Sequence, residues 1–168
     1  PTAELFINGK SYGKQSKNNS SLKSRYRLMW MDAVYEPGEV KVVAYNKDGK
    51  AVAEKTVRTA GKPHHIELVS NRNELTADGK DLAYVTVKVV DKDGNLCPTD
   101  SRLIHFSVKG AGKFRAVANG DPTNLEQFHL PKMHAFHGML TAIVQAGEIA
   151  GDLVLTAKAS GVKTGTVH

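Results

Sequence analysis

Polar side chains suited to contact a ligand gather in the stretch from Ala118 to Asn124. Asn119, Asp121 and Thr123 carry an amide, a carboxylate and a hydroxyl group at alternate positions. A turn-forming loop at the end of a strand is where a β-sandwich presents its binding surfaces. These three residues are therefore candidates for contact with a sugar. The alternative is a plain connection whose polar groups are satisfied by its own Asx turns.

Trp30 is the single tryptophan of the chain and the other candidate for sugar contact. Its ring offers a large flat apolar surface on which a sugar can stack. However, Tyr26, Leu28 and Trp30 alternate with other residues, which predicts a strand over 25–32 with these three side chains on one face. Packing in a core is therefore the competing interpretation of Trp30.

The histidines and the lone cysteine do not predict a metal site. His134 and His137 are three positions apart, so on a strand they would point to opposite faces, and no His-Glu-x-x-His pattern accompanies them. We expect the neighbours His64 and His65 to point two ways for the same reason. Cys97 has no partner for a disulfide or a metal cluster, and a buried, inert thiol is expected. No metal and no cofactor is predicted.

No catalytic constellation is recognisable either. The chain lacks a Gly-x-Ser-x-Gly motif, and its Gly110-Ala111-Gly112 turn has no third glycine with which to form a phosphate-binding loop. Glycosidase chemistry needs two carboxylates held about 5 to 10 Å apart, whereas the acidic residues here fall mostly in turns and on solvent-facing positions. The sequence predicts that these residues do not form an enzyme active site.

The elements that must position these residues are short strands joined by tight turns. Asn8-Gly9 between two short runs is a strong signal for a type I′ hairpin. Alternating or short apolar runs predict further strands at 25–32, 39–46, 52–58, 64–69, 82–91, 103–109, 113–118, 139–145, 152–160 and 163–167. Residues 119–138 are expected to form a long loop. No segment has a helical period, which predicts an all-β protein.

The stretch from Thr59 to Pro63 divides the chain. Gly61 tolerates dihedrals that other residues avoid, and Pro63 restricts Lys62 to extended conformations. We predict two consecutive immunoglobulin-like antiparallel β-sandwiches, a small one at 1–61 and a second of about seven strands at 62–168. The alternative is a long connection inside one larger sandwich.

Charge and hydropathy exclude some partners. The net charge is +6, but lysine and arginine are scattered singly, which favours a solvated surface over a nucleic-acid interface. No apolar run is long enough for membrane insertion. The chain starts without methionine, almost at a strand, and we expect it to be cut from a longer protein, with a first module that lacks a strand of its complete relatives.

Several motifs in order resemble the β-sandwiches that follow the catalytic barrel in glycoside hydrolase family 2 enzymes, often β-galactosidases of gut Bacteroides. The first module carries ELFINGKSYG at 4–13, YEPGEVKVVAY at 35–45 and TVRTAG at 56–61. The second carries DGKDL at 78–82, VVDKDG at 89–94, FSVKGAG at 106–112, NGDPT at 119–123 and AFHG at 135–138. The resemblance covers nearly the whole chain.

The resemblance implies a non-catalytic C-terminal scaffold of a larger, retaining β-glycoside hydrolase. In that family both catalytic glutamates lie on the barrel, so none is carried over here. The implied partners are the parent's barrel and other domains, and carbohydrate is a further candidate. A periplasmic or secreted location is expected from the resemblance. An autonomous carbohydrate-binding module and a cell-surface spacer or adhesin remain the alternatives.

Overall fold

The computed structural model describes residues 2–168 and divides into two compact units. The first unit ends at Thr59 and the second runs from Ala60 to His168. The division falls within the glycine- and proline-containing stretch on which the sequence placed a joint, two residues before the expected boundary after Gly61. The sheets of both units are antiparallel, so the predicted all-β class is confirmed.

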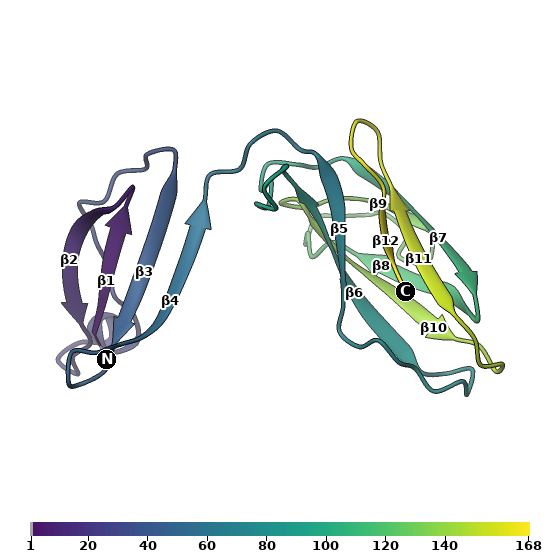
Figure 1. Ribbon diagram of the computed structural model, residues 1–168, viewed down its shortest axis with the longest axis horizontal. Helices are drawn as coiled ribbons and strands as arrows, with labels where there is room; N and C mark the ends of the chain where they lie inside the picture. Colours follow the sequence, from purple (N-terminus) through teal and green to yellow (C-terminus); the bar gives the residue numbers. More distant parts are fainter. Residues whose placement is uncertain (1) are drawn as a thin grey trace. The chain divides into compact units, whose positions relative to one another are not determined.

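The first unit is built on one four-stranded sheet with the order β2-β1-β3-β4 (Figure 1). Its strands are β1 (Thr2–Ile7), β2 (Lys10–Ser16), β3 (Glu39–Tyr45) and β4 (Ala51–Arg58). Asn8 and Gly9 connect β1 to β2 with φ values of 48° and 81°, the positive values that a type I′ turn requires, so the predicted hairpin is confirmed. β4 ends the sheet and leaves Val52 and Val57 exposed.

The two faces of this sheet differ in character. Leu5 and Ile7 of β1 are buried and lie opposite Val42 and Val40 of β3, which makes one face apolar. On the other face Glu4 accepts hydrogen bonds from Ser11 and Tyr45. The sequence led us to expect a small sandwich, but residues 2–59 contribute a single sheet rather than two packed layers.

The segment between β2 and β3 corrects one sequence prediction. Residues 25–32 do not form a strand, because the chain makes the short helix α1 (Leu22–Tyr26) and then continues without regular structure. Ser21 caps α1, and its hydroxyl accepts a hydrogen bond from the backbone N–H of Ser24 at 3.2 Å. The alternation at Tyr26, Leu28 and Trp30 was therefore a misleading signal.

The second unit contains eight strands in two four-stranded sheets, one more strand than the number expected. The first sheet has the order β5-β6-β10-β8 and the second the order β12-β11-β7-β9. The strands are β5 (His65–Ser70), β6 (Leu82–Val90), β7 (Leu103–Gly110), β8 (Gly112–Ala118), β9 (Lys132–His134), β10 (Met139–Ala146), β11 (Leu153–Lys158) and β12 (Gly165–Val167). The unexpected strand is β9, which lies inside the stretch predicted as a loop.

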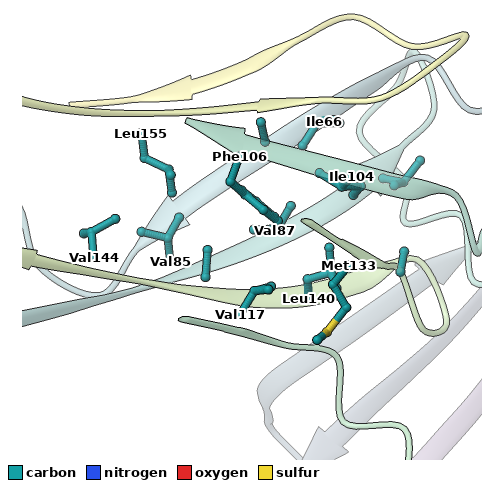
Figure 2. Close-up of a cluster of buried hydrophobic side chains, with 14 of the residues drawn as sticks. Ile66, Val85, Val87, Ile104, Phe106, Val117, Met133, Leu140, Val144 and Leu155 are labelled. Carbon is teal, nitrogen blue, oxygen red and sulfur yellow. The ribbon is translucent and has the colours of Figure 1, made fainter. Parts of the chain in front are cut away.

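The core of the second unit lies between its two sheets. Figure 2 shows Val85 and Val87 of β6 and Val144 of β10 directed towards Phe106 of β7 and Leu155 of β11. All five side chains are buried, in line with the alternation of inward and outward residues along these strands. This two-layer packing makes the second unit a β-sandwich of the predicted kind.

Asp91 is the one buried acidic residue among those described, and it fixes the start of the second unit. Its Oδ2 accepts a hydrogen bond from the backbone N–H of Gly61 at 2.7 Å, and its Oδ1 accepts bonds from the backbone N–H groups of Asp93 and Asn95. These donors, Gly61 above all, hold the pKa of Asp91 well below its ordinary range. The sequence indicated only a hairpin turn here.

Candidate functional site

The candidate sugar-contacting loop connects β8 to β9. It is attached to both sheets of the sandwich: the backbone N–H of Val117 on β8 donates to the carbonyl of Phe128, and that of Phe106 on β7 donates to the carbonyl of Pro131. Both distances are 2.8 Å. The loop is therefore anchored at its C-terminal part, while its N-terminal part carries the predicted residues.

The structure brings Asn119, Asp121 and Thr123 together. Asp121 Oδ1 accepts hydrogen bonds from the backbone N–H and the hydroxyl of Thr123, both at 2.8 Å. The Asn119 side chain accepts from the Asp121 backbone N–H and donates to the carbonyl of His134. The N–H and O–H of Thr123 lower the pKa of Asp121, so this carboxylate is ionised near neutral pH.

These bonds include the Asx turns that are expected if the loop is a plain connection between strands. They leave one acceptor: Asp121 Oδ2 has no hydrogen-bond partner within residues 2–168. Thr123 is exposed and Asp121 is half-buried, so both are accessible. The loop therefore combines a backbone held by side-chain hydrogen bonds with one carboxylate oxygen that is free to accept another.

Trp30 belongs to the first unit and is not part of this loop. Its indole N–H donates a hydrogen bond to the carbonyl of Gly13 on β2 at 2.9 Å, and its side chain is half-buried. The ring is thus fixed against the sheet, in a position intermediate between the fully packed side chain and the exposed platform that the sequence left as alternatives.

The histidines have separate partners. His134 Nδ1 lies 3.0 Å from Glu126 Oε1, whereas His137 Nδ1 lies 3.3 Å from the carbonyl of Pro98. The expectation that His64 and His65 point two ways is wrong: their Nδ1 atoms lie 3.0 Å apart and their rings are in edge-to-face contact. Within residues 2–168 no three metal-ligating side chains come together.

Cys97 is buried, as predicted. Its thiol faces the carbonyl of Gly61 at 3.8 Å, and burial raises its pKa above the ordinary value. A thiol in such surroundings is a packing element rather than a nucleophile.

A pocket of about 540 Å³ opens into the second sandwich, and none of the four candidate sugar-contacting residues lines it. Val85, Val144 and Leu155 lie at its inner surface, and Arg72 and Asp152 are among its polar lining residues. Arg72 is already paired with Asp81 at 3.0 Å. The sequence offers no signal for this pocket because its lining comes from strands of both sheets.

Two groups of exposed apolar side chains were also missed. One lies between β2 and β3 and consists of Leu22, Tyr26, Met29, Met31, Val34 and Tyr35. The other lies in the β8–β9 loop and consists of Leu125, Phe128 and Leu130. Apolar residues in segments without a strand partner are the signal that would have identified both groups. No helix within residues 2–168 has the length and apolar character needed to cross a bilayer.

The fold and these surfaces define a class of protein: antiparallel β modules with exposed loops and apolar patches. Comparisons with known proteins place the chain within that class. Residues 66–168 match the family described as glycoside hydrolase family 2 C-terminal domain 5, and residues 1–53 match a domain of unknown function. The chain therefore belongs to the family of glycoside hydrolase family 2 C-terminal domains.

Named relatives agree with this assignment. The chain is 44% identical over 160 residues to the β-galactosidase BoGH2A of Bacteroides ovatus, an alignment that covers 95% of this chain and 18% of the relative. A family 2 member from Bacteroides cellulosilyticus superposes with a TM-score of 0.84 at 32% identity, and a β-glycosidase from Bacteroides vulgatus with 0.89 at 28%. These structures are matched over 99% of this chain and over 22% and 20% of their own chains.

The chain thus spans about a fifth of the length of the proteins it matches, and it corresponds to their C-terminal part. This confirms the resemblance inferred from the sequence motifs.

Proposed function

We propose that this chain is the non-catalytic C-terminal scaffold of a larger β-galactosidase-like enzyme that hydrolyses β-glycosides in a separate barrel domain. The observation that carries the proposal is the match to the C-terminal fifth of enzymes named β-galactosidase and β-glycosidase. Its partners are then the barrel and the other domains of the same polypeptide.

The surroundings of Asp91 and of the largely buried Asp100 side chain support a structural role. Asp91 is saturated by backbone N–H groups. Asp100 is bonded to the Arg102 guanidinium, with Oδ2 2.6 Å from Nη2. Burial raises the pKa of Asp100, but the hydrogen bonds and the charge of Arg102 together lower it by more. The pKa of Asp100 therefore lies below its ordinary value. Neither group is poised to donate a proton near neutral pH, as the general acid of a glycosidase must.

The test compares two proteins in a chromogenic β-galactoside assay. The complete polypeptide encoded by the gene is expected to hydrolyse the substrate, and the 168-residue chain alone is expected to show none of that turnover. Turnover by the chain alone would overturn the proposal. Inactivity of the complete polypeptide on every β-glycoside of a panel would overturn the hydrolase assignment.

A second role, contact with carbohydrate, is supported by the open oxygen of Asp121 in the β8–β9 loop. Isothermal titration of the chain with galactose, lactose and plant oligosaccharides measures it directly. Asp121→Ala should abolish any binding at the loop, whereas Asp48→Ala, in an exposed turn of the first unit, should leave it unchanged. Binding lost instead in Trp30→Ala would transfer the site to the first unit, and absence of binding to the unmodified chain would refute this role.

A further inference from the structure

The segment from Leu22 to Tyr35 is unusually rich in exposed apolar side chains. Of the 14 large hydrophobic side chains exposed among the described residues, six lie in these fourteen positions. They are Leu22, Tyr26, Met29, Met31, Val34 and Tyr35, and we call them the apolar segment. A soluble monomer rarely leaves such a concentration uncovered without a functional reason.

The apolar segment is held in place by the sheet rather than free in solution. The Trp30 indole N–H is bonded to the Gly13 carbonyl, and the Tyr35 hydroxyl lies 3.2 Å from the Thr59 hydroxyl. On either side of the half-buried Trp30, Met29 and Met31 have exposed fractions of 41% and 83%. The segment thus uses Trp30 as its inward anchor and presents the methionines outward, and a preorganised surface of this kind loses little entropy on docking.

The chemistry of the segment selects the kind of partner. Leucine, valine and methionine, which make up four of the six side chains, carry no hydrogen-bond donor for a sugar, and methionine side chains adapt well to an irregular apolar surface. Lys23, Arg25 and Arg27 lie at the N-terminal end of the same segment. An apolar protein surface with an acidic rim fits this pattern.

The alternative occupant, a second copy of the chain, is tested below by the dependence of Met31 protection on protein concentration.

We propose that the apolar segment is the docking surface through which this region binds another domain of the same polypeptide, one that presents an apolar patch with an acidic rim. This rests on the proposed function, because the matched relatives extend over about five times the length of this chain and therefore contain further domains. The apolar segment is exposed here and buried in the complete enzyme.

Methionine oxidation by dilute hydrogen peroxide, followed by peptide mass spectrometry, tests the proposal. Oxidation follows exposure of the thioether, so Met31 should react about tenfold more slowly in the complete polypeptide than in the 168-residue chain. Met133, which is fully buried in the second sandwich, is the internal standard and should react slowly in both. Equal Met31 rates in the two proteins would overturn the proposal.

A pair of variants separates docking from general exposure. In the complete polypeptide, Met31→Asp should weaken docking and raise the oxidation rate of Met29 about fivefold. Val52→Asp, at a position that is 61% exposed on β4, should leave that rate unchanged. Unaltered Trp30 fluorescence of Met31→Asp in the isolated chain verifies that the fold is intact. An unchanged Met29 rate in Met31→Asp would contradict the proposal.

The chromogenic assay on the same preparation distinguishes the two hypotheses. An active complete polypeptide with reactive Met31 refutes the docking surface and leaves the proposed function standing. An inactive complete polypeptide in which Met31 is protected refutes the proposed function and leaves the docking surface standing. Protection of Met31 that grows with the concentration of the isolated chain would overturn the proposal in favour of self-association.

Discussion

Truncation of Ile104 tests whether the second sandwich is an independently packed unit. Ile104 lies on β7 and is completely buried. Replacement by alanine removes about three methylene equivalents, worth about 0.8 kcal/mol each or about 2.4 kcal/mol together. The cavity left behind adds to this, and we expect a total loss of about 3.5 kcal/mol. With a urea m-value of about 2 kcal/mol/M, the midpoint should fall by about 1.8 M.

Two spectroscopic signals separate the units in this experiment. Trp30, the single tryptophan, lies in the first unit, so selectively excited tryptophan fluorescence follows that unit alone. Far-UV circular dichroism is dominated by the larger second unit. Ile104→Ala should therefore shift the dichroism midpoint and leave the fluorescence midpoint unchanged.

The control is Val69→Ala on β5, where the side chain is 46% exposed and the loss should be below about 0.5 kcal/mol. Equal shifts of both signals in Ile104→Ala would refute the reasoning, because they would show that the two units unfold together. A dichroism shift no larger than that of Val69→Ala would show that Ile104 is not part of a close-packed core.

Three further predictions concern single residues. Gly110 has a φ of +91°, and in Gly110→Ala the added Cβ would also clash with the backbone carbonyl of Asp152, which precedes β11. Gly49 has a φ of +78°, and the Cβ of Gly49→Ala would meet no neighbour. Thermal melts should therefore show a loss of stability of about 1–2 kcal/mol for Gly49→Ala and a larger loss for Gly110→Ala. Because the pKa of Asp91 is lowered in the folded state, its contribution to stability is complete above about pH 4 and declines as the pH falls towards the lowered folded-state value. Acid titration of Asp91→Asn should lack that decline, and an unchanged pH profile would contradict it. Arg102→Ala removes the guanidinium that neutralises the largely buried Asp100 carboxylate and should reduce the free energy of unfolding in urea by about 2–3 kcal/mol, an expectation that a loss below about 0.5 kcal/mol would rule out.

The sequence predicted those parts of the fold that local patterns determine. Val85, Val87 and Val89 alternate along β6 and are all buried, because a strand between two neighbours has to turn one face to the core. Asn8-Gly9 predicted its turn because few other residue pairs tolerate two consecutive positive φ values.

The failures arose where the outcome depended on distant partners. The alternation that ends at Trp30 looked like a strand, but Trp30 bonds to Gly13, 17 positions away, and the backbone around it pairs with no sheet. The bond from Gly61 to Asp91 spans 30 positions and is invisible in a local pattern. β9 has only three residues and exists because β7 offers it an edge.

The same contrast applies to the candidate site. Asn119, Asp121 and Thr123 were predicted to share one turn-forming loop because they are neighbours in the sequence, and the geometry of their turn follows from their side-chain chemistry. The apolar segment was missed because exposure is a property of the surroundings. Met31 in isolation is indistinguishable from a core methionine.

The sequence of the edge strand β4 disfavours pairing between two copies of this strand, for a reason that follows from symmetry. When two copies of a strand pair antiparallel about a two-fold axis, the side chains that meet must share a face, so the axis has to pass through a residue and its own copy. The two registers that use nearly all of β4 (Ala51–Arg58) centre on Glu54 or on Lys55. Each brings identical charges into direct opposition, which disfavours the pairing. The edge strand β4 is therefore disfavoured from pairing with a second copy of itself. Its unpaired backbone groups remain accessible to a strand of different sequence.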